Sequence, residues 1–276
     1  MLVNKRAKAF QKARAFFQER GITETDCPLL SRFASIDAHI DLIEAQTFQG
    51  RRFLITSPEY AMKRLLSEGA PDIYFLGHVF RDSEQGSRHS PEFTMAEWYR
   101  HHFTMEEMIQ ETLDFCKLFT GALPVESYTY HEAFRYFAGQ EVGETDLDLV
   151  MINEIEPRMN KEALTVIYHF PANQAALAVR EGHIAHRFEI YAGGLELCNG
   201  YHELADPVEQ KARFIEENNK RHELCKAALP IDTFLLDAIE SLPPCSGVAV
   251  GFDRLLMLEW GAKHIEEVQL FSWNNI

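Results

Sequence analysis

Two strand-like runs joined by a polar loop constrain the fold of this chain more than any other feature. Residues 73–80 are mostly apolar and rich in aromatic and β-branched side chains, whereas residues 93–100 alternate between two faces. The loop between them, residues 82–92, is polar and contains Gly86 and Pro91. We therefore expect an antiparallel pair of strands connected by a long functional loop.

The second run carries a carboxylate on a face that is otherwise aromatic. Alternation places Glu97 on the same face as Phe93 and Tyr99. Burial of a carboxylate there costs free energy unless it meets a cation or a hydrogen-bond donor. Arg81 precedes the loop and Arg88 lies within it. Because guanidinium groups bind phosphate oxygens bidentately, the stretch favours a phosphate-containing ligand.

Composition limits the class of protein. The 276 residues, 46% apolar and 25% charged, can form a large core in one big domain or two small ones. A formal net charge of −15 argues against a broad surface for nucleic acid. The five cysteines form no CxxC pair and no HExxH pattern occurs, so we expect reduced thiols in the cytoplasm and no zinc site. No apolar run is long enough to span a membrane.

An amphipathic helix is expected at the N-terminus. Apolar residues recur at helical spacing over residues 4–20, and Gly21 follows. A short strand-like run, residues 22–25, then leads to Cys27 and Pro28. The pattern fits a plain packing helix with a solvated basic face as well as it fits a helix with a special role.

A second helix is expected over residues 56–69. Ser57 is a good N-cap, Pro58 suits the first helical position, and Glu59 favours the positive end of the helix. Capping alone explains these residues. The functional alternative is that Glu59 faces a cationic substrate.

Two glutamates seven residues apart mark a strand that follows a glycine turn at residues 193–194. Strict alternation would place Glu196 and Glu203 on opposite faces, so they serve one site only if the strand breaks phase between them. A bulge at residues 199–200 would provide that break. Two converging carboxylates suit Mg²⁺, and two exposed strand glutamates are the alternative.

Residues 246–258 predict a glycine-spaced apolar strand that runs directly into a helix. Glycine at positions 247 and 251 allows a ligand to approach the backbone. Arg254 lies in the first helical turn, where the helix dipole disfavours a cation. The arginine is therefore expected to do something else, such as hold a phosphate.

The remaining patterns predict further elements: helices at 103–119, 130–137 and 206–226, strands at 166–171 and 187–191, and a solvated acidic loop at 141–148. The helix at 206–226 has a complete start signal. Asp206 is its predicted cap, Pro207 its first residue, and Glu209 closes a capping box.

The stretch RHSPEFTMAEWYR resembles motif 2 of the class II aminoacyl-tRNA synthetases, and specifically their lysyl branch. GVAVGFDRL is similar to motif 3, and the N-terminal helix and strand are similar to motif 1, which forms the dimer interface. The resemblance implies an α+β fold, a mostly antiparallel β-sheet flanked by helices, and a homodimer formed through motif 1. It implies one catalytic domain over residues 1–276, with motif 1 at about 5–28, motif 2 at about 73–100 and motif 3 at about 246–260.

SPEYAMKRLL, YHFPANQAALA and ELCNGYHELADPVEQ extend the resemblance over almost the whole chain. Together they resemble the lysyl-tRNA synthetase paralogues that attach (R)-β-lysine to a lysine of elongation factor P. The chain begins at motif 1, so we expect no anticodon-binding domain and little contact with tRNA. Position 249 is alanine, where lysyl-tRNA synthetases carry glycine. One methyl group discriminates by only about 1–3 kcal/mol, so lysine stays an alternative to (R)-β-lysine.

The implied reaction needs no protein nucleophile, because the substrate carboxylate attacks the α-phosphate of ATP to form an aminoacyl-adenylate. Catalysis is then positioning and charge neutralisation, assigned by resemblance to Arg81 and Arg254. The implied ATP-binding residues are Arg81, Asp82, Ser83, Glu84, Arg88, His89, Phe93, Glu196, Leu197, Gly251 and Arg254. The implied substrate-binding residues are Ser57, Pro58, Glu59, Glu97, Tyr99, Asn199, Tyr201, Glu203 and Ala249. By the same resemblance, Glu196 and Glu203 coordinate Mg²⁺.

One position departs from the family pattern. Ser83 stands where the family has a glutamate that contacts the adenine amino group, and Glu84 or a backbone carbonyl would have to replace it. Three hypotheses stay open: a ligase for elongation factor P, a lysine-activating synthetase that charges tRNA or another carrier, and a non-catalytic paralogue. The complete set of phosphate and metal residues argues against the third.

Overall fold

The computed structural model describes residues 1–143 and 146–276. The helices are α1 (Leu2–Glu19), α2 (Glu59–Ser67), α3 (Met105–Thr120), α4 (Tyr130–Ala133), α5 (Leu147–Val150), α6 (Pro207–Glu223), α7 (Thr233–Ile239) and α8 (Phe252–Trp260). The strands are β1 (Thr23–Glu24), β2 (Leu30–Ser31), β3 (Glu44–Thr47), β4 (Gly50–Leu54), β5 (Ile73–Phe80), β6 (Glu92–His101), β7 (Val125–Thr129), β8 (Leu164–Pro171), β9 (Arg180–Glu181), β10 (Ile184–Ala192), β11 (Leu195–His202) and β12 (Cys245–Gly251). The expected antiparallel pair is confirmed as β5 and β6, in register from Ile73 opposite Tyr99 to Phe80 opposite Glu92.

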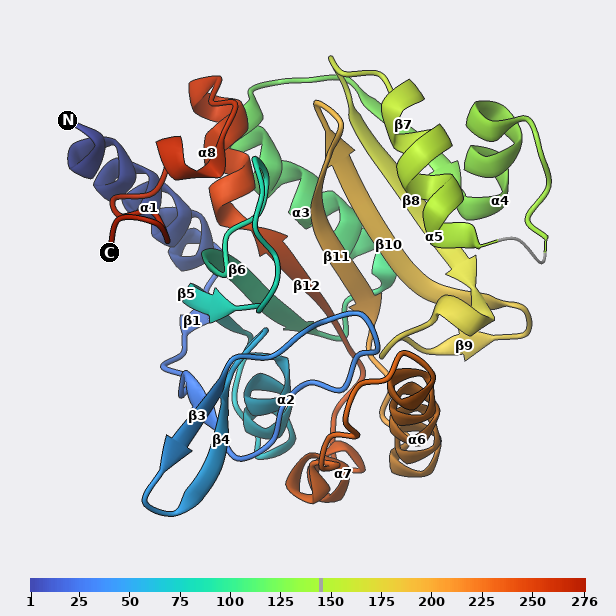
Figure 1. Cartoon of the computed structure of the whole chain (residues 1–276). Helices are drawn as coiled ribbons and strands as arrows, with labels where there is room; N and C mark the ends of the chain where they lie inside the picture. The colour runs from blue at the N-terminus through green and yellow to red at the C-terminus, as the bar shows by residue number, and fades with distance from the viewer. Residues whose placement is uncertain (144–145) are drawn as a thin grey trace.

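One large sheet organises the chain (Figure 1). Its strand order is β1-β5-β6-β12-β11-β10-β8-β7, with β9 paired to β10. Only the outer pairs β1–β5 and β7–β8 are parallel. A small antiparallel sheet, β2-β4-β3, lies apart from it. The prediction of a mostly antiparallel sheet flanked by helices is confirmed.

Helices α1, α3 and α8 cover one face of the large sheet (Figure 1). The core beneath them is aromatic: Phe17 stacks on Tyr74 with ring centroids 4.1 Å apart, and Trp98 lies 5.2 Å from Phe115. On the other face, α2 and α7 cover β5 and β6, while α4 and α5 cover β8 and β10. Two separate covers on this face leave β12, β11 and the part of β6 around Glu97 open between them.

A buried ion pair fastens α1 to the start of α8. Arg6 Nη1 lies 2.7 Å from Asp253 Oδ1, with 9% and 2% of the two side chains exposed. Arg6 also donates to the Val268 carbonyl, 2.6 Å, and to Thr94 Oγ1, 3.0 Å. Asp253 Oδ2 accepts the Thr94 N–H of β6. Helix α1, strand β6 and the start of α8 are therefore joined through two charged side chains.

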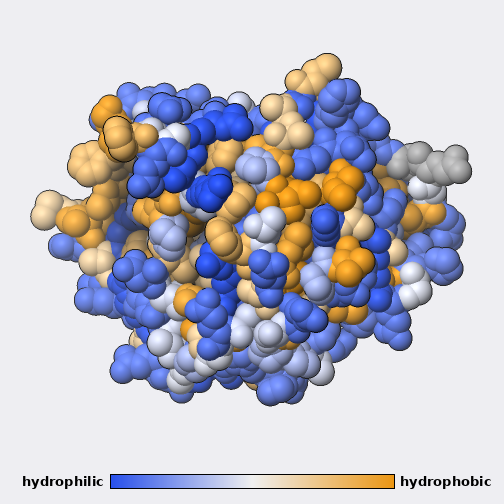
Figure 2. Space-filling view, turned by 90° about the horizontal axis from the view of Figure 1, so that it is seen from below, coloured by the Kyte–Doolittle hydropathy of each residue, from blue (hydrophilic) through white to orange (hydrophobic). Residues whose placement is uncertain are grey.

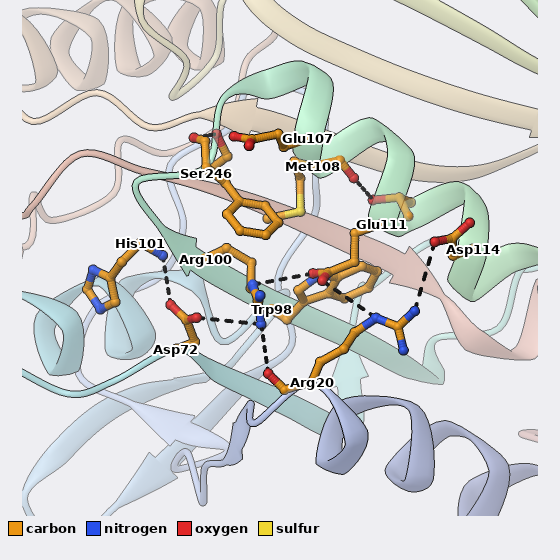
Figure 3. Close-up of polar contacts among 12 residues, drawn as sticks. Arg20, Asp72, Trp98, Arg100, His101, Glu107, Met108, Glu111, Asp114 and Ser246 are labelled. Atoms are coloured by element: carbon orange, nitrogen blue, oxygen red, sulfur yellow. Dashed lines mark hydrogen bonds and ion pairs between the residues drawn. The ribbon is translucent and has the colours of Figure 1, made fainter.

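A second polar network joins β6 to α3 and to the end of α1 (Figure 3). Trp98 Nε1 donates to Glu111 Oε1 at 3.0 Å, and Arg100 Nε lies 3.6 Å from the same carboxylate oxygen. Arg100 Nη1 reaches Asp72 Oδ2 at 3.5 Å and donates to the Arg20 carbonyl. Burial raises the pKa of Glu111, and the arginines beside it oppose that rise. The network supplies the partners that buried charge requires.

The structure corrects three local predictions. Pro58, not Ser57, is the N-cap of α2, and the Ser57 hydroxyl accepts the Glu59 N–H at 3.0 Å. Asp206 caps α6 as predicted, but Glu209 pairs with Arg213 instead of closing a capping box. The predicted acidic loop at 141–148 is interrupted, because Asp146 caps α5; residues 144–145 of that loop lie outside the described residues.

Hydrophilic residues make up most of the molecular face seen in Figure 2, with hydrophobic residues gathered near its centre and right. Among the described residues, no helix is both long and apolar enough to cross a membrane.

Candidate active site

A cavity of about 860 Å³ opens on the uncovered part of the sheet, between the two covers. It brings together most of the residues singled out in the sequence: Ser57, Glu59, Arg81, Glu84, Arg88, His89, Phe93, Glu97, Tyr99, Glu196, Leu197, Asn199, Tyr201, Glu203, Ala249, Gly251 and Arg254. Pro58, Asp82 and Ser83 do not line it. Segments separated by up to 197 residues, from Ser57 to Arg254, thus meet in one site.

Glu97 lies at the floor of the cavity and shares a face of β6 with Phe93 and Tyr99, as alternation predicted. Its carboxylate accepts hydrogen bonds from Tyr99 Oη, 2.8 Å, and from Ser57 Oγ, 3.0 Å. Burial raises the pKa of Glu97 to about 8, the charge of Glu59 adds to the rise, and the two hydroxyl donors oppose it. A buried carboxylate of this kind gains a counter-charge when a cation binds beside it.

Lys63 is a site residue that sequence reasoning missed. Its side chain is 3% exposed, and Nζ lies 2.7 Å from Glu59 Oε1 and 2.6 Å from Glu203 Oε2. The two neighbouring carboxylates raise its pKa against the effect of burial. A signal was present, because Glu59 and Lys63 are four residues apart on a predicted helix and share one face.

Both carboxylate oxygens of Glu203 are buried without a hydrogen-bond partner within residues 1–143 and 146–276. Oε2 meets the Lys63 ammonium as an ion pair, and Oε1 has no partner of either kind among the described residues. It lies against Gly247, where an added Cβ would come within 2.6 Å of this oxygen and 2.3 Å of the Tyr99 ring. Glycine at position 247 therefore lets the carboxylate and the phenol approach the backbone of β12.

Cationic side chains gather on the opposite side of the cavity. Arg254 Nη1 donates to the Glu196 carbonyl at 2.7 Å, and Nη2 donates to His89 Nε2 at 2.7 Å. Arg88 Nη1 donates to the Gly194 carbonyl at 2.8 Å, and the Arg81 guanidinium lies 5.3 Å from the centre of the Phe93 ring. Burial and the charge of Arg254 lower the pKa of His89. The arrangement suits a polyphosphate lying beside an aromatic base.

Strand β11 breaks phase, but two residues earlier than predicted. Its register against β10 shifts opposite Ile190 and Tyr191, so that Leu197 and Cys198 both point into the core. Asn199 and Gly200 lie in a regular ladder with β12. The break still brings Glu196 and Glu203 to the same cavity, as the hypothesis of one shared site requires.

Comparison with known proteins identifies the family. A model of the class II tRNA synthetases for aspartate, lysine and asparagine (D, K and N) matches residues 2–275. The chain belongs to the class II tRNA synthetase family. It is 41% identical over 304 aligned positions to the elongation factor P–(R)-β-lysine ligase of Actinobacillus succinogenes, covering 98% of this chain and 94% of that protein. The ligases of Haemophilus influenzae and Salmonella arizonae are each 38% identical, covering 98% and 97% of this chain and 94% of each relative.

The loop between β5 and β6 departs from the class II pattern at Ser83, whose φ of 61° lies in the left-handed region. The Ser83 N–H donates to Asp82 Oδ1, so it is not free to bind a ligand in the cavity. Glu84 lines the cavity instead, with its carboxylate 3.8 Å from Arg81 Nη1. Glu84 is therefore the acidic side chain with which this loop lines the cavity.

The carboxylates of Glu196, Glu189 and Glu156 give a test of fit for Mg²⁺. Burial and the charges of Glu196 and Glu189 raise the pKa of Glu156 to about 7. The Glu203 carboxylate is paired with Lys63, and the Glu189 carboxylate is paired with Arg187 and accepts a hydrogen bond from Tyr191. No group of three His, Cys, Asp or Glu side chains within residues 1–143 and 146–276 is arranged as a closed metal site. The Glu196 carboxylate, which lines the cavity, fits a cation that takes its other ligands from phosphate oxygens and water, as Mg²⁺ does.

Binding of a cationic ligand at the floor of the cavity is expected to release a proton from Glu97. With a pKa of about 8 this carboxyl is mostly protonated at pH 7 in the free protein, and a bound ammonium favours the ionised form. Calorimetry of lysine binding at pH 7 in phosphate and in Tris should give heats that differ by the buffers' ionisation enthalpies. Glu97→Gln should remove the difference, and equal heats for the unmodified chain would contradict the assignment.

Glu97 also has an effect on stability. Its folded-state pKa lies above the ordinary value of 4.5, so the folded protein binds this proton more tightly than the unfolded chain. The contribution of Glu97 to stability is therefore present below about pH 4.5 and is lost as pH rises through about 8.

Proposed function

We propose that this chain is an ATP-dependent ligase that activates (R)-β-lysine, or lysine, as an adenylate and transfers it to a lysine side chain of elongation factor P. The observation that carries the proposal is the division of one cavity into an acidic floor, for ammonium groups, and a guanidinium-lined side, for phosphates. The names of the full-length relatives support the same activity.

The first step joins the substrate carboxylate to the α-phosphorus of ATP and expels pyrophosphate. Arg81 is proposed to hold the α-phosphate, and Arg88, His89 and Arg254 to hold the outer phosphates. Phe93 is proposed to stack on adenine, with Gly251 beside it. These groups neutralise charge that develops on the phosphates, and they are already oriented before ligand binds.

The substrate ammonium groups are proposed to lie on the floor. Glu97, Glu203 and Tyr99 face them, and Ala249 lies between Glu97 and Asn199 in the sheet register, where its methyl group narrows the pocket. In the second step an acceptor lysine amine, as its free base, attacks the adenylate carbonyl. The new amide bond forms, AMP leaves, and the amine loses a proton.

We propose Glu196 as the protein ligand of Mg²⁺, because its carboxylate lines the cavity, whereas both oxygens of the neighbouring Glu189 already accept hydrogen bonds, from Arg187 and from Tyr191. The Glu203 carboxylate is better assigned to substrate, because Lys63 already occupies one of its oxygens. Bound Mg²⁺ would supply positive charge to the phosphates of ATP.

We also propose that the chain forms a single catalytic domain and pairs with a second copy through the α1–β1 segment. The proposed location is the cytoplasm, which the scattered cysteines support.

ATP–pyrophosphate exchange with Mg²⁺ tests the function. We expect exchange with (R)-β-lysine to exceed exchange with (S)-β-lysine, L-lysine or no amino acid, followed by a mass increase of elongation factor P. Preference for L-lysine with charging of tRNA would instead support a lysyl-carrier synthetase. Absence of exchange with every amino acid would support a non-catalytic paralogue and implicate Ser83.

A further inference from the structure

The rim of the cavity has one apolar part. Among the large hydrophobic side chains that are exposed on the described residues, Leu149 and Ile152 alone also line the cavity, and each is 55% exposed. They are three residues apart on the segment formed by α5 and the π-helical turn Met151–Ile155. Residues three apart lie on one side of a helical turn, so the two side chains form one surface, the apolar lip.

The apolar lip is held rigidly from beneath. Val150, Met151 and Ile155 on the other side of the same segment are buried in the core against β8 and β10. Asp146 caps the segment by accepting the Leu149 N–H. The lip is thus the outer face of an anchored turn, and nothing within residues 1–143 and 146–276 covers that face.

Two carboxylates accompany the lip. Asp146 and Asp148 are exposed and line the same side of the cavity, and Asp148 accepts a hydrogen bond from Gln174 at 2.9 Å. The far rim offers polar groups, where Lys220 is already paired with Glu217 at 2.8 Å. An incoming group at the lip therefore meets apolar surface and negative charge together.

We infer that the apolar lip and its two aspartates form the docking surface for the lysine-bearing segment of the acceptor protein. The inference rests on the proposed function, because only a transfer reaction brings a protein lysine to this cavity. A lysine side chain has an apolar stem and a cationic end, which match the lip and the carboxylates. A polyanion such as tRNA would be repelled by the same aspartates.

The test separates the two half-reactions in the full-length protein. Leu149→Ser/Ile152→Ser is expected to leave ATP–pyrophosphate exchange with (R)-β-lysine within twofold of the unmodified chain. The same variant should raise the KM for elongation factor P tenfold or more, because the apolar contact is lost. Intact-mass spectrometry of elongation factor P measures the transfer. Val208→Ser/Leu224→Ser, which removes exposed apolar side chains away from the cavity, is the matched control and should change neither.

A second variant tests the charges. Asp146→Asn/Asp148→Asn keeps a capping side chain at position 146 and should raise the acceptor KM severalfold, with a weaker dependence on salt.

An unchanged acceptor KM in the Leu149/Ile152 variant would overturn the inference, as would a parallel loss of exchange, which would mean that the cavity itself was damaged. Absence of exchange in the unmodified chain would instead remove the proposed function. Exchange without any transfer to elongation factor P would show that this protein is not the acceptor, and the inference about its docking surface would fail.

Discussion

Replacement of Arg254 by alanine is expected to lower ATP–pyrophosphate exchange by about 10²–10³-fold, the usual cost of removing one preorganised donor to transition-state charge. The guanidinium lies among Arg81, Arg88 and His89 and is fixed by hydrogen bonds to the Glu196 carbonyl and to His89. Because the guanidinium is already directed toward the cavity, it does not have to reorganise when phosphate binds.

The Arg254 side chain is 21% exposed and does not contribute to the aromatic core, so the variant should unfold at nearly the same temperature. Arg254→Lys keeps a charge but loses the fork and should retain an intermediate rate. Normal exchange by Arg254→Ala would remove this residue, and the phosphate assignment built on it, from the site.

Replacement of Arg6 by alanine is expected to cost about 3–5 kcal/mol of the free energy of unfolding, because it leaves the Asp253 carboxylate buried without its cation. Only 2% of the Asp253 side chain is exposed. Three contacts of the arginine, to Asp253, Val268 and Thr94, are lost together. Urea denaturation followed by tryptophan fluorescence measures the change.

Arg14→Ala is the matched control on the same helix. Arg14 pairs with Glu24 at 3.0 Å, but the two side chains are 46% and 42% exposed, so its loss should cost about 0–1 kcal/mol. Equal losses in the two variants would show that burial does not set the strength of these pairs.

Local alternation was enough to predict the strands that carry the site. The faces of β6 follow directly from the order of apolar and polar residues, so Glu97 and Tyr99 were placed correctly on the cavity side. The bulge was assigned to Asn199 and Gly200 because glycine tolerates unusual backbone angles. The better signal was the apolar pair Leu197–Cys198, since two successive core residues break alternation by themselves.

Other features depend on contacts between distant segments. The order of strands in the sheet places β12 between β6 and β11, and no local pattern encodes that arrangement. Lys63 was overlooked because a lysine on a helix is usually solvated, and only the fold brings Glu203 to it. The small β2-β4-β3 sheet was likewise not predicted, since its strands are short and Phe53 is their one buried residue.

The buried Lys63 fixes how many positive charges a ligand must bring to the floor of the cavity. When all groups are ionised, Glu59, Glu97 and Glu203 carry three negative charges. The Lys63 ammonium pairs with Glu59 and Glu203 and supplies one positive charge, so two negative charges stay uncompensated. An amino acid with two ammonium groups neutralises them once its carboxylate has been turned toward ATP. An amino acid with one ammonium leaves a buried charge unpaired, which is costly. Selection of a diamino acid is thus a matter of electroneutrality as much as of shape.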